Sequence, residues 1–309
     1  MSAEVEFDWP ALWAGLEPLP SDAERERVWR GHGHRWLSKI VAVLGGDFAL
    51  HEVGGFWVVS GQPAKHVERV GRLLQSARRR ILADLDGIAC DPLHSRLAVL
   101  WLDNEEIYYD YISRTYPDAG EFAFSGGSFL SGGYPHFVFP HYQEFRELER
   151  LMSHELTHAL VSHLPLPLWL NEGIAVTMEE VIAGGWRARG VVEMLKEYPD
   201  FWNEETIQEF WSGRSFSRGD EGNGLSYGLA HLLALNFAHD FDRFRGFTLA
   251  ANAADAGESA ARNHLGISLG DMVGALLGEG DWVPKPERWV RDRSEAASTP
   301  AMSRPEVLR

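Results

Sequence analysis

Residues 151–173 read LMSHELTHALVSHLPLPLWLNEG, and this stretch places two histidines, His154 and His158, four residues apart. Residues at this spacing lie on the same face of an α-helix, so both imidazoles can reach one metal ion, with Glu155 beside them to transfer a proton. A catalytic zinc takes three protein ligands and keeps one position open. The next carboxylate downstream is Glu172. The pattern therefore predicts the chemistry of a zinc hydrolase, with Glu172 as the third ligand.

The apolar residues around the motif predict two helices joined by a turn that contains Pro165 and Pro167. The first helix is expected over about 142–163 and the second from Leu168 through Val181. Five residues of helix beyond His158 advance the chain by roughly 7 Å, and about five residues of the second helix return Glu172 to the level of the histidines. The alternative reading is two surface histidines and an unrelated glutamate.

The segment His154-Glu155-Leu156-Thr157-His158, followed by Trp169-Leu170-Asn171-Glu172-Gly173-Ile174-Ala175, resembles the gluzincin metallopeptidases, most closely the peptidase MA-like families. The resemblance implies a zincin-like fold, one Zn²⁺ held by the two histidines and the later glutamate, and a peptide or protein substrate. The M1 aminopeptidases have a longer spacing before that glutamate, and their G-A-M-E-N segment is absent from this sequence. The resemblance therefore implies peptide hydrolysis and argues against aminopeptidase activity.

The same resemblance implies further site residues. These peptidases place a tyrosine or histidine from a later helix opposite the zinc, and Tyr227 and His231 lie one turn apart in the matching stretch. An edge strand before the motif helix pairs with extended substrate, which points to His136, Phe137, Val138 and Phe139. Glu179 lies two turns after Glu172 and is either a hydrogen-bond partner of a ligand histidine or a solvated helix charge.

Two alternatives to peptide hydrolysis remain open at this point. A chain with the same motif can bind zinc without cleaving peptides and serve in binding or regulation. The same zinc site can also hydrolyse a bond other than a peptide bond.

The order of the elements predicts an α+β fold, with a zincin-like mixed-sheet lobe followed by a mainly α-helical lobe. Upstream of the motif the patterns predict the following elements: a helix over 23–44, a strand over 56–59, a helix over 63–85, a strand over 97–102, a helix over 105–114 and a hairpin over 126–140. Downstream they predict helices over 190–197, 204–211, 227–240 and 269–277, with a polar loop over 212–223. The expected domains are an N-terminal arm and helix over 1–45, the catalytic lobe over 46–182, a helical lobe over 183–283 and a disordered tail over 284–309.

The composition restricts the partners. With 29 basic and 45 acidic residues the formal charge is -16, which repels nucleic-acid backbones and anionic membranes. The single cysteine, Cys90, excludes an intramolecular disulfide and a cysteine-based zinc cluster. The acidic residues 1–8 lack the features of a secretory signal, and no apolar run reaches membrane-spanning length. We therefore expect a soluble, cytoplasmic protein with no nucleic-acid or membrane partner.

Overall fold

The computed structural model describes residues 7–113, 126–140, 144–184, 190, 198 and 200–289. The chain divides into two compact units, one made of residues 1–84 and 90–160 and the other of residues 85–89 and 161–309. The ten helices and strands described for the first unit are α1 (Trp9–Ala14), α2 (Asp22–Leu44), β1 (Ala49–Val53), β2 (Phe56–Ser60), α3 (Ala64–Asp84), β3 (Ala98–Trp101), α4 (Glu105–Ile112), β4 (Ser128–Leu130), β5 (His136–Phe139) and α5 (Phe145–Val161), the last of which ends one residue into the second unit.

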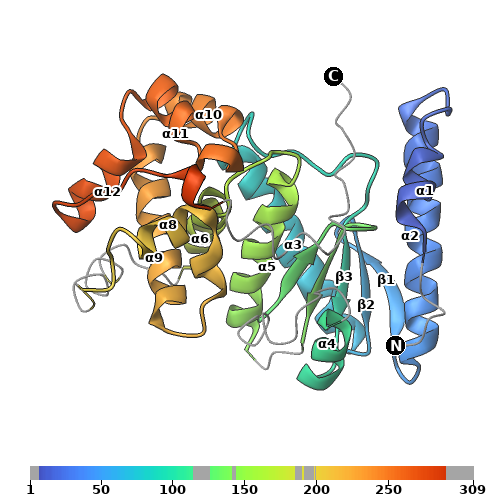
Figure 1. Ribbon diagram of the computed structural model, residues 1–309. Coiled ribbons are helices and arrows are strands. Elements are labelled where there is room, and N and C mark those ends of the chain that lie inside the picture. Colours follow the sequence, from blue (N-terminus) through green and yellow to red (C-terminus); the bar gives the residue numbers. More distant parts are fainter. Residues whose placement is uncertain are drawn as a thin grey trace. The chain divides into compact units, whose positions relative to one another are not determined.

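The first unit is built on a five-stranded mixed sheet with the strand order β1-β2-β3-β5-β4 (Figure 1). The three inner strands run parallel, and the outer strands β1 and β4 are each antiparallel to their neighbour. All four residues of β3 are buried, as the continuous apolar run over 97–102 predicts for a strand covered on both faces. The predicted hairpin over 126–140 is confirmed, because β4 pairs antiparallel with β5.

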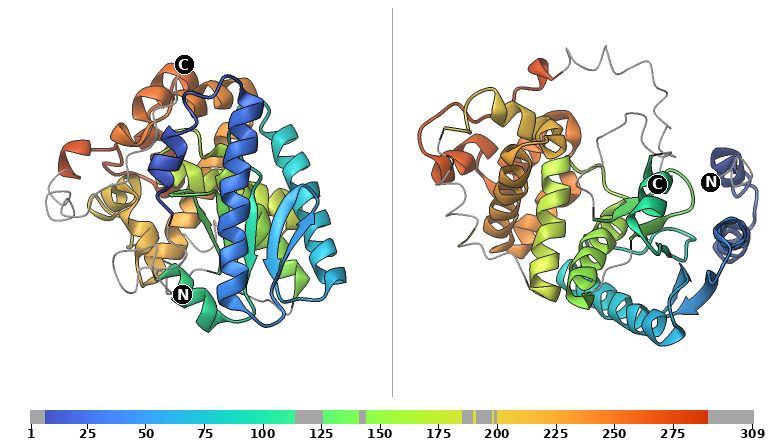
Figure 2. Two further views of the ribbon diagram at one scale, coloured as in Figure 1. Left: turned by 90° about the vertical axis from the view of Figure 1, so that its right-hand side faces the viewer. Right: turned by 90° about the horizontal axis from the view of Figure 1, so that it is seen from below.

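Helices α2 and α3 lie on opposite faces of this sheet (Figure 2). Trp36, Leu37 and Ile40 of α2 belong to one apolar cluster with alternate strand residues, among them Trp57 and Leu100. The intervening strand residues face the other way, because successive side chains of a strand point to opposite faces.

The described elements of the second unit are all helices. Its elements are α6 (Leu168–Ala183), α8 (Thr206–Ser212), η2 (Arg214–Ser217), α9 (Glu221–Ala238), α10 (Phe241–Ala250), η3 (Ala253–Asp255), α11 (Glu258–Ala260), η4 (Ala261–Leu265), α12 (Leu269–Leu277) and η5 (Pro286–Arg288). Helices α6 and α9 pack closely, since a Cβ atom added to Gly173 would lie 2.5 Å from the carbonyl oxygen of Ala230. Trp169 of α6 is fully buried and donates its indole N–H to the Ala256 carbonyl at 2.9 Å.

The α+β class predicted from the sequence is confirmed, and several boundaries differ from the predictions. Helix α9 begins at Glu221, six residues before the expected start at Tyr227, and η2 lies within the predicted polar loop. The N-terminal arm, for which the sequence patterns predicted no element before residue 23, contains α1. The helix expected over 190–197 falls outside the described ranges, apart from residue 190, and so does the expected tail over 284–309 after residue 289. The described start of that tail contains η5 and is therefore ordered. Among the described residues, no helix has the length and apolar character needed to cross a membrane.

Candidate metal centre

Helix α5 carries the two motif histidines on one face. His154 and His158 are both half-buried, and their Nε2 atoms lie 3.1 Å apart. Two nitrogens bound to one tetrahedral zinc at about 2.0–2.1 Å from the metal would be separated by roughly 3.3 Å. The pair is therefore already close to the spacing that a shared zinc requires.

Glu172 of α6 supplies a third candidate ligand atom. The ligand atoms of His154, His158 and Glu172 all lie within 4.8 Å of one another. Glu172 is 8 % exposed, and a buried carboxylate costs free energy unless a cation or hydrogen bonds compensate its charge. Two imidazoles and one carboxylate form a donor set that catalytic zinc sites use, and these residues therefore fit a zinc ion.

Glu155 contacts the sheet of the first unit. Its side chain is 8 % exposed, and its Oε2 atom accepts a hydrogen bond of 2.7 Å from the backbone N–H of Phe129 in β4. This contact joins the motif helix to the last strand of the sheet. It could not be predicted from the sequence, because every residue except proline has a backbone N–H and the residue type does not show which one donates.

The expectation that residues 136–139 form an edge strand is wrong. Strand β5 pairs with β3 on one side and β4 on the other, so its backbone is already occupied. The side chains of His136, Phe137, Val138 and Phe139 are buried. Among the described strands, the edge at this end of the sheet is β4, because the hairpin places residues 128–130 outside β5.

His136 takes part in a buried hydrogen-bond chain in the first unit. Its Nδ1–H donates to the Tyr134 carbonyl at 2.7 Å, so its Nε2 accepts from the Tyr111 hydroxyl, also at 2.7 Å. Burial lowers the pKa of His136 to about 4, which keeps the ring neutral at pH 7. Burial also raises the pKa of Tyr111, so the phenol stays a donor.

Tyr227 and His231, the two residues that the resemblance implies opposite the zinc, lie on α9 in the second unit. Tyr227 packs its ring edge-on against Phe216, with centroids 5.1 Å apart. His231 is fully buried, with Nε2 3.0 Å from Oε2 of Glu180. Burial lowers the pKa of His231 to about 4, although the charge of Glu179 opposes this shift. Glu179 itself is 7 % exposed, so it is not a solvated helix charge.

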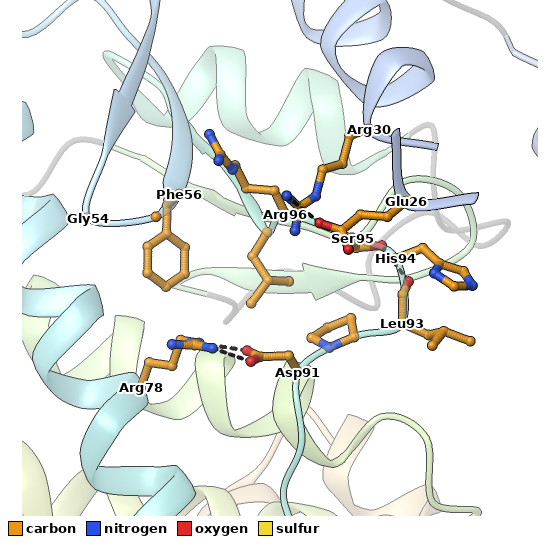
Figure 3. A pocket seen from close by; sticks show the side chains of 13 residues that line it. Glu26, Arg30, Gly54, Phe56, Arg78, Asp91, Leu93, His94, Ser95 and Arg96 are labelled. Atoms are coloured by element: carbon orange, nitrogen blue, oxygen red, sulfur yellow. Dashed lines mark hydrogen bonds and ion pairs between the residues drawn. The ribbon is translucent and has the colours of Figure 1, made fainter. Parts of the chain in front are cut away.

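The first unit also holds a cavity of about 480 Å³ that was not predicted from the sequence (Figure 3). Its arginines come from different elements, and each is paired with a carboxylate. Arg30 lies 2.6 Å from Glu26, Arg78 binds Asp91 through both nitrogens of one guanidinium edge, and Arg96 pairs with Glu52. Because these charges are compensated in pairs, we assign this cavity no ligand.

The sequence was compared with family models and with curated proteins. No family model matches the chain, and no curated protein matches it.

Proposed function

We propose that this chain is a zinc-dependent metallopeptidase of the gluzincin type. The observation that carries the proposal is the convergence of the His154, His158 and Glu172 ligand atoms within 4.8 Å, in a chain whose Glu155 directly follows the first histidine. Two histidines and a glutamate are the ligands of a catalytic rather than a closed structural zinc site, since a three-residue set leaves a position for water and substrate.

In this proposal, bound Zn²⁺ supplies a Lewis acid and lowers the pKa of its water to about 7. His154, His158 and Glu172 hold the ion, with the imidazoles binding in their neutral form. Glu155 takes the proton of the attacking water as general base and returns it to the leaving amine as general acid. Tyr227 and His231 are the two candidates for stabilising the oxyanion that forms as the water attacks the peptide carbonyl.

An extended peptide is the substrate that best suits the edge of the sheet. Strand β4 is the last strand in the order, and the N–H of Phe129 points away from β5 because it donates to Glu155. The N–H and C=O of one strand residue point to the same side, so the Phe129 carbonyl faces outward as well. In this proposal it accepts a hydrogen bond from a peptide N–H, a mode of recognition that makes little demand on the peptide's sequence.

The test is a cleavage screen of zinc-loaded protein on unfolded proteins and peptide libraries. We expect wild type to cleave, and Glu155→Gln to lose roughly 10²- to 10⁴-fold in rate while retaining its zinc. Glu149→Gln is the matched control, because it neutralises a half-buried carboxyl on the same helix away from the ligands. Failure of zinc-loaded wild type to cleave any substrate would support the alternative, a zinc-binding domain without peptidase activity.

A further inference from the structure

The hydrogen bond between Phe129 and Glu155 joins strand β4 to the helix that carries the candidate general base. We propose that the backbone N–H of Phe129 is the positioning group for the Glu155 carboxylate, an inference that rests on the proposed hydrolytic function. The donor is 2.7 Å from Oε2 of Glu155. Because β4 ends the sheet, no further strand among the described residues competes for this N–H.

The charge and burial of Glu155 make this bond a strong one. The side chain is 8 % exposed, and hydrogen bonds to an ionised acceptor are shorter and stronger than those between neutral groups. Within the described part of the chain, Phe129 is the one donor that the structure shows on this carboxylate. It commits Oε2 to the strand and leaves Oε1 to exchange a proton with the attacking water.

The donor itself is held in place by packing across the hairpin. Phe129 is the register partner of Phe137, and the two rings have centroids 5.5 Å apart. Gly127, just before β4, approaches β5 so closely that an added Cβ atom would lie 2.4 Å from the Phe139 ring. A backbone N–H fixed in this way has no rotamers to lose, and it therefore orients the base more strictly than a side-chain donor would.

The first experiment compares Phe129→Pro with Phe129→Ala in zinc-loaded protein. Proline removes the N–H, and an edge strand tolerates proline where the N–H pointed outward. Alanine removes the ring to the same extent and keeps the N–H, so the ratio of the two variants isolates the donor. We expect kcat of the proline variant to lie roughly ten- to hundredfold below that of the alanine variant, with similar KM and one equivalent of zinc in both.

A second readout does not depend on activity or on the folding of the proline variant. In zinc-loaded protein labelled with [¹⁵N]phenylalanine, the Phe129 amide is assigned by its loss in Phe129→Leu. Glu155→Gln should move this amide proton upfield and Glu155→Ala should speed its exchange with solvent, because the charged acceptor is replaced or removed. The amides of the other phenylalanines are the internal control.

The outcomes separate this inference from the function on which it rests. Equal kcat in the proline and alanine variants, or a Phe129 amide that does not respond to Glu155→Gln, overturns the positioning role even if wild type is an active peptidase. Wild type that cleaves nothing removes the proposed function, and with it the positioning role of Phe129 in catalysis, while the amide measurement still reports whether the bond forms.

Discussion

At the scale of single residues, the buried chain from Tyr111 through His136 to the Tyr134 carbonyl stabilises the first unit. Tyr111→Phe would leave the Nε2 atom of His136 buried without its donor, which costs about 1–3 kcal/mol of unfolding free energy. Urea denaturation measures the loss. Tyr109→Phe is the control, since this half-buried tyrosine on the same helix should change stability by less than about 0.5 kcal/mol. Equal stability of both variants would contradict this assignment.

The candidate ligands could be named from the sequence because their geometry is local. His154 and His158 are one helical turn apart, and Glu172 follows in the next helix after a short turn. The donor to Glu155 could not be named, because it is a backbone group from a strand 26 residues away in sequence. Side-chain identity predicts ligands and bases, whereas the backbone groups that orient them depend on the strand order.

At the scale of elements, the close packing of α6 and α9 makes Gly173 a position where a methyl group is not tolerated. Gly173→Ala would bring a Cβ atom to 2.5 Å from the Ala230 carbonyl oxygen, and relieving this contact should cost about 1–3 kcal/mol despite the higher helix propensity of alanine. Gly31→Ala in α2 is the matched control, because no atom lies within 4 Å of the added methyl group. It should raise stability by about 0.5–1 kcal/mol, and thermal unfolding of both variants checks the opposite signs.

The bounds of most helices could be predicted from the sequence, whereas the order of the strands in the sheet could not. Helix α12 was expected over the residues that form it, and α2 and α3 agree with their predictions to within one residue at each end. The start of α9 was missed because Gly222 and Gly224 are typical of a loop. In the structure both glycines belong to the helix, and the Asp220 side chain caps it by accepting a hydrogen bond from the Gly222 N–H. The edge position was assigned to the wrong strand of the hairpin, because both segments are short and apolar and the pattern does not show which one pairs with β3.

At the scale of the whole molecule, stability should fall as the pH drops below about 6.5. His136 has a pKa of about 4 in the folded chain and an ordinary value near 6.5 when unfolded. Between these values the unfolded state binds more protons, so this residue's contribution to stability is lost as the pH falls, at up to about 1.4 kcal/mol per pH unit. His136→Gln should flatten the slope of unfolding free energy between pH 6.5 and 5.5. An unchanged slope would show that His136 is not neutral in the folded state.

The central claim is that one metal site is formed by His154, His158 and Glu172. Calorimetric titration of the chelator-stripped chain with Zn²⁺ tests it most directly. We predict one equivalent for wild type and for Glu155→Gln, and an affinity lowered on the order of 100-fold or more in His158→Ala and in Glu172→Ala, because each removes one of three protein ligands. Zinc binding that is absent from wild type, or that Glu172→Ala leaves unchanged, would contradict the account.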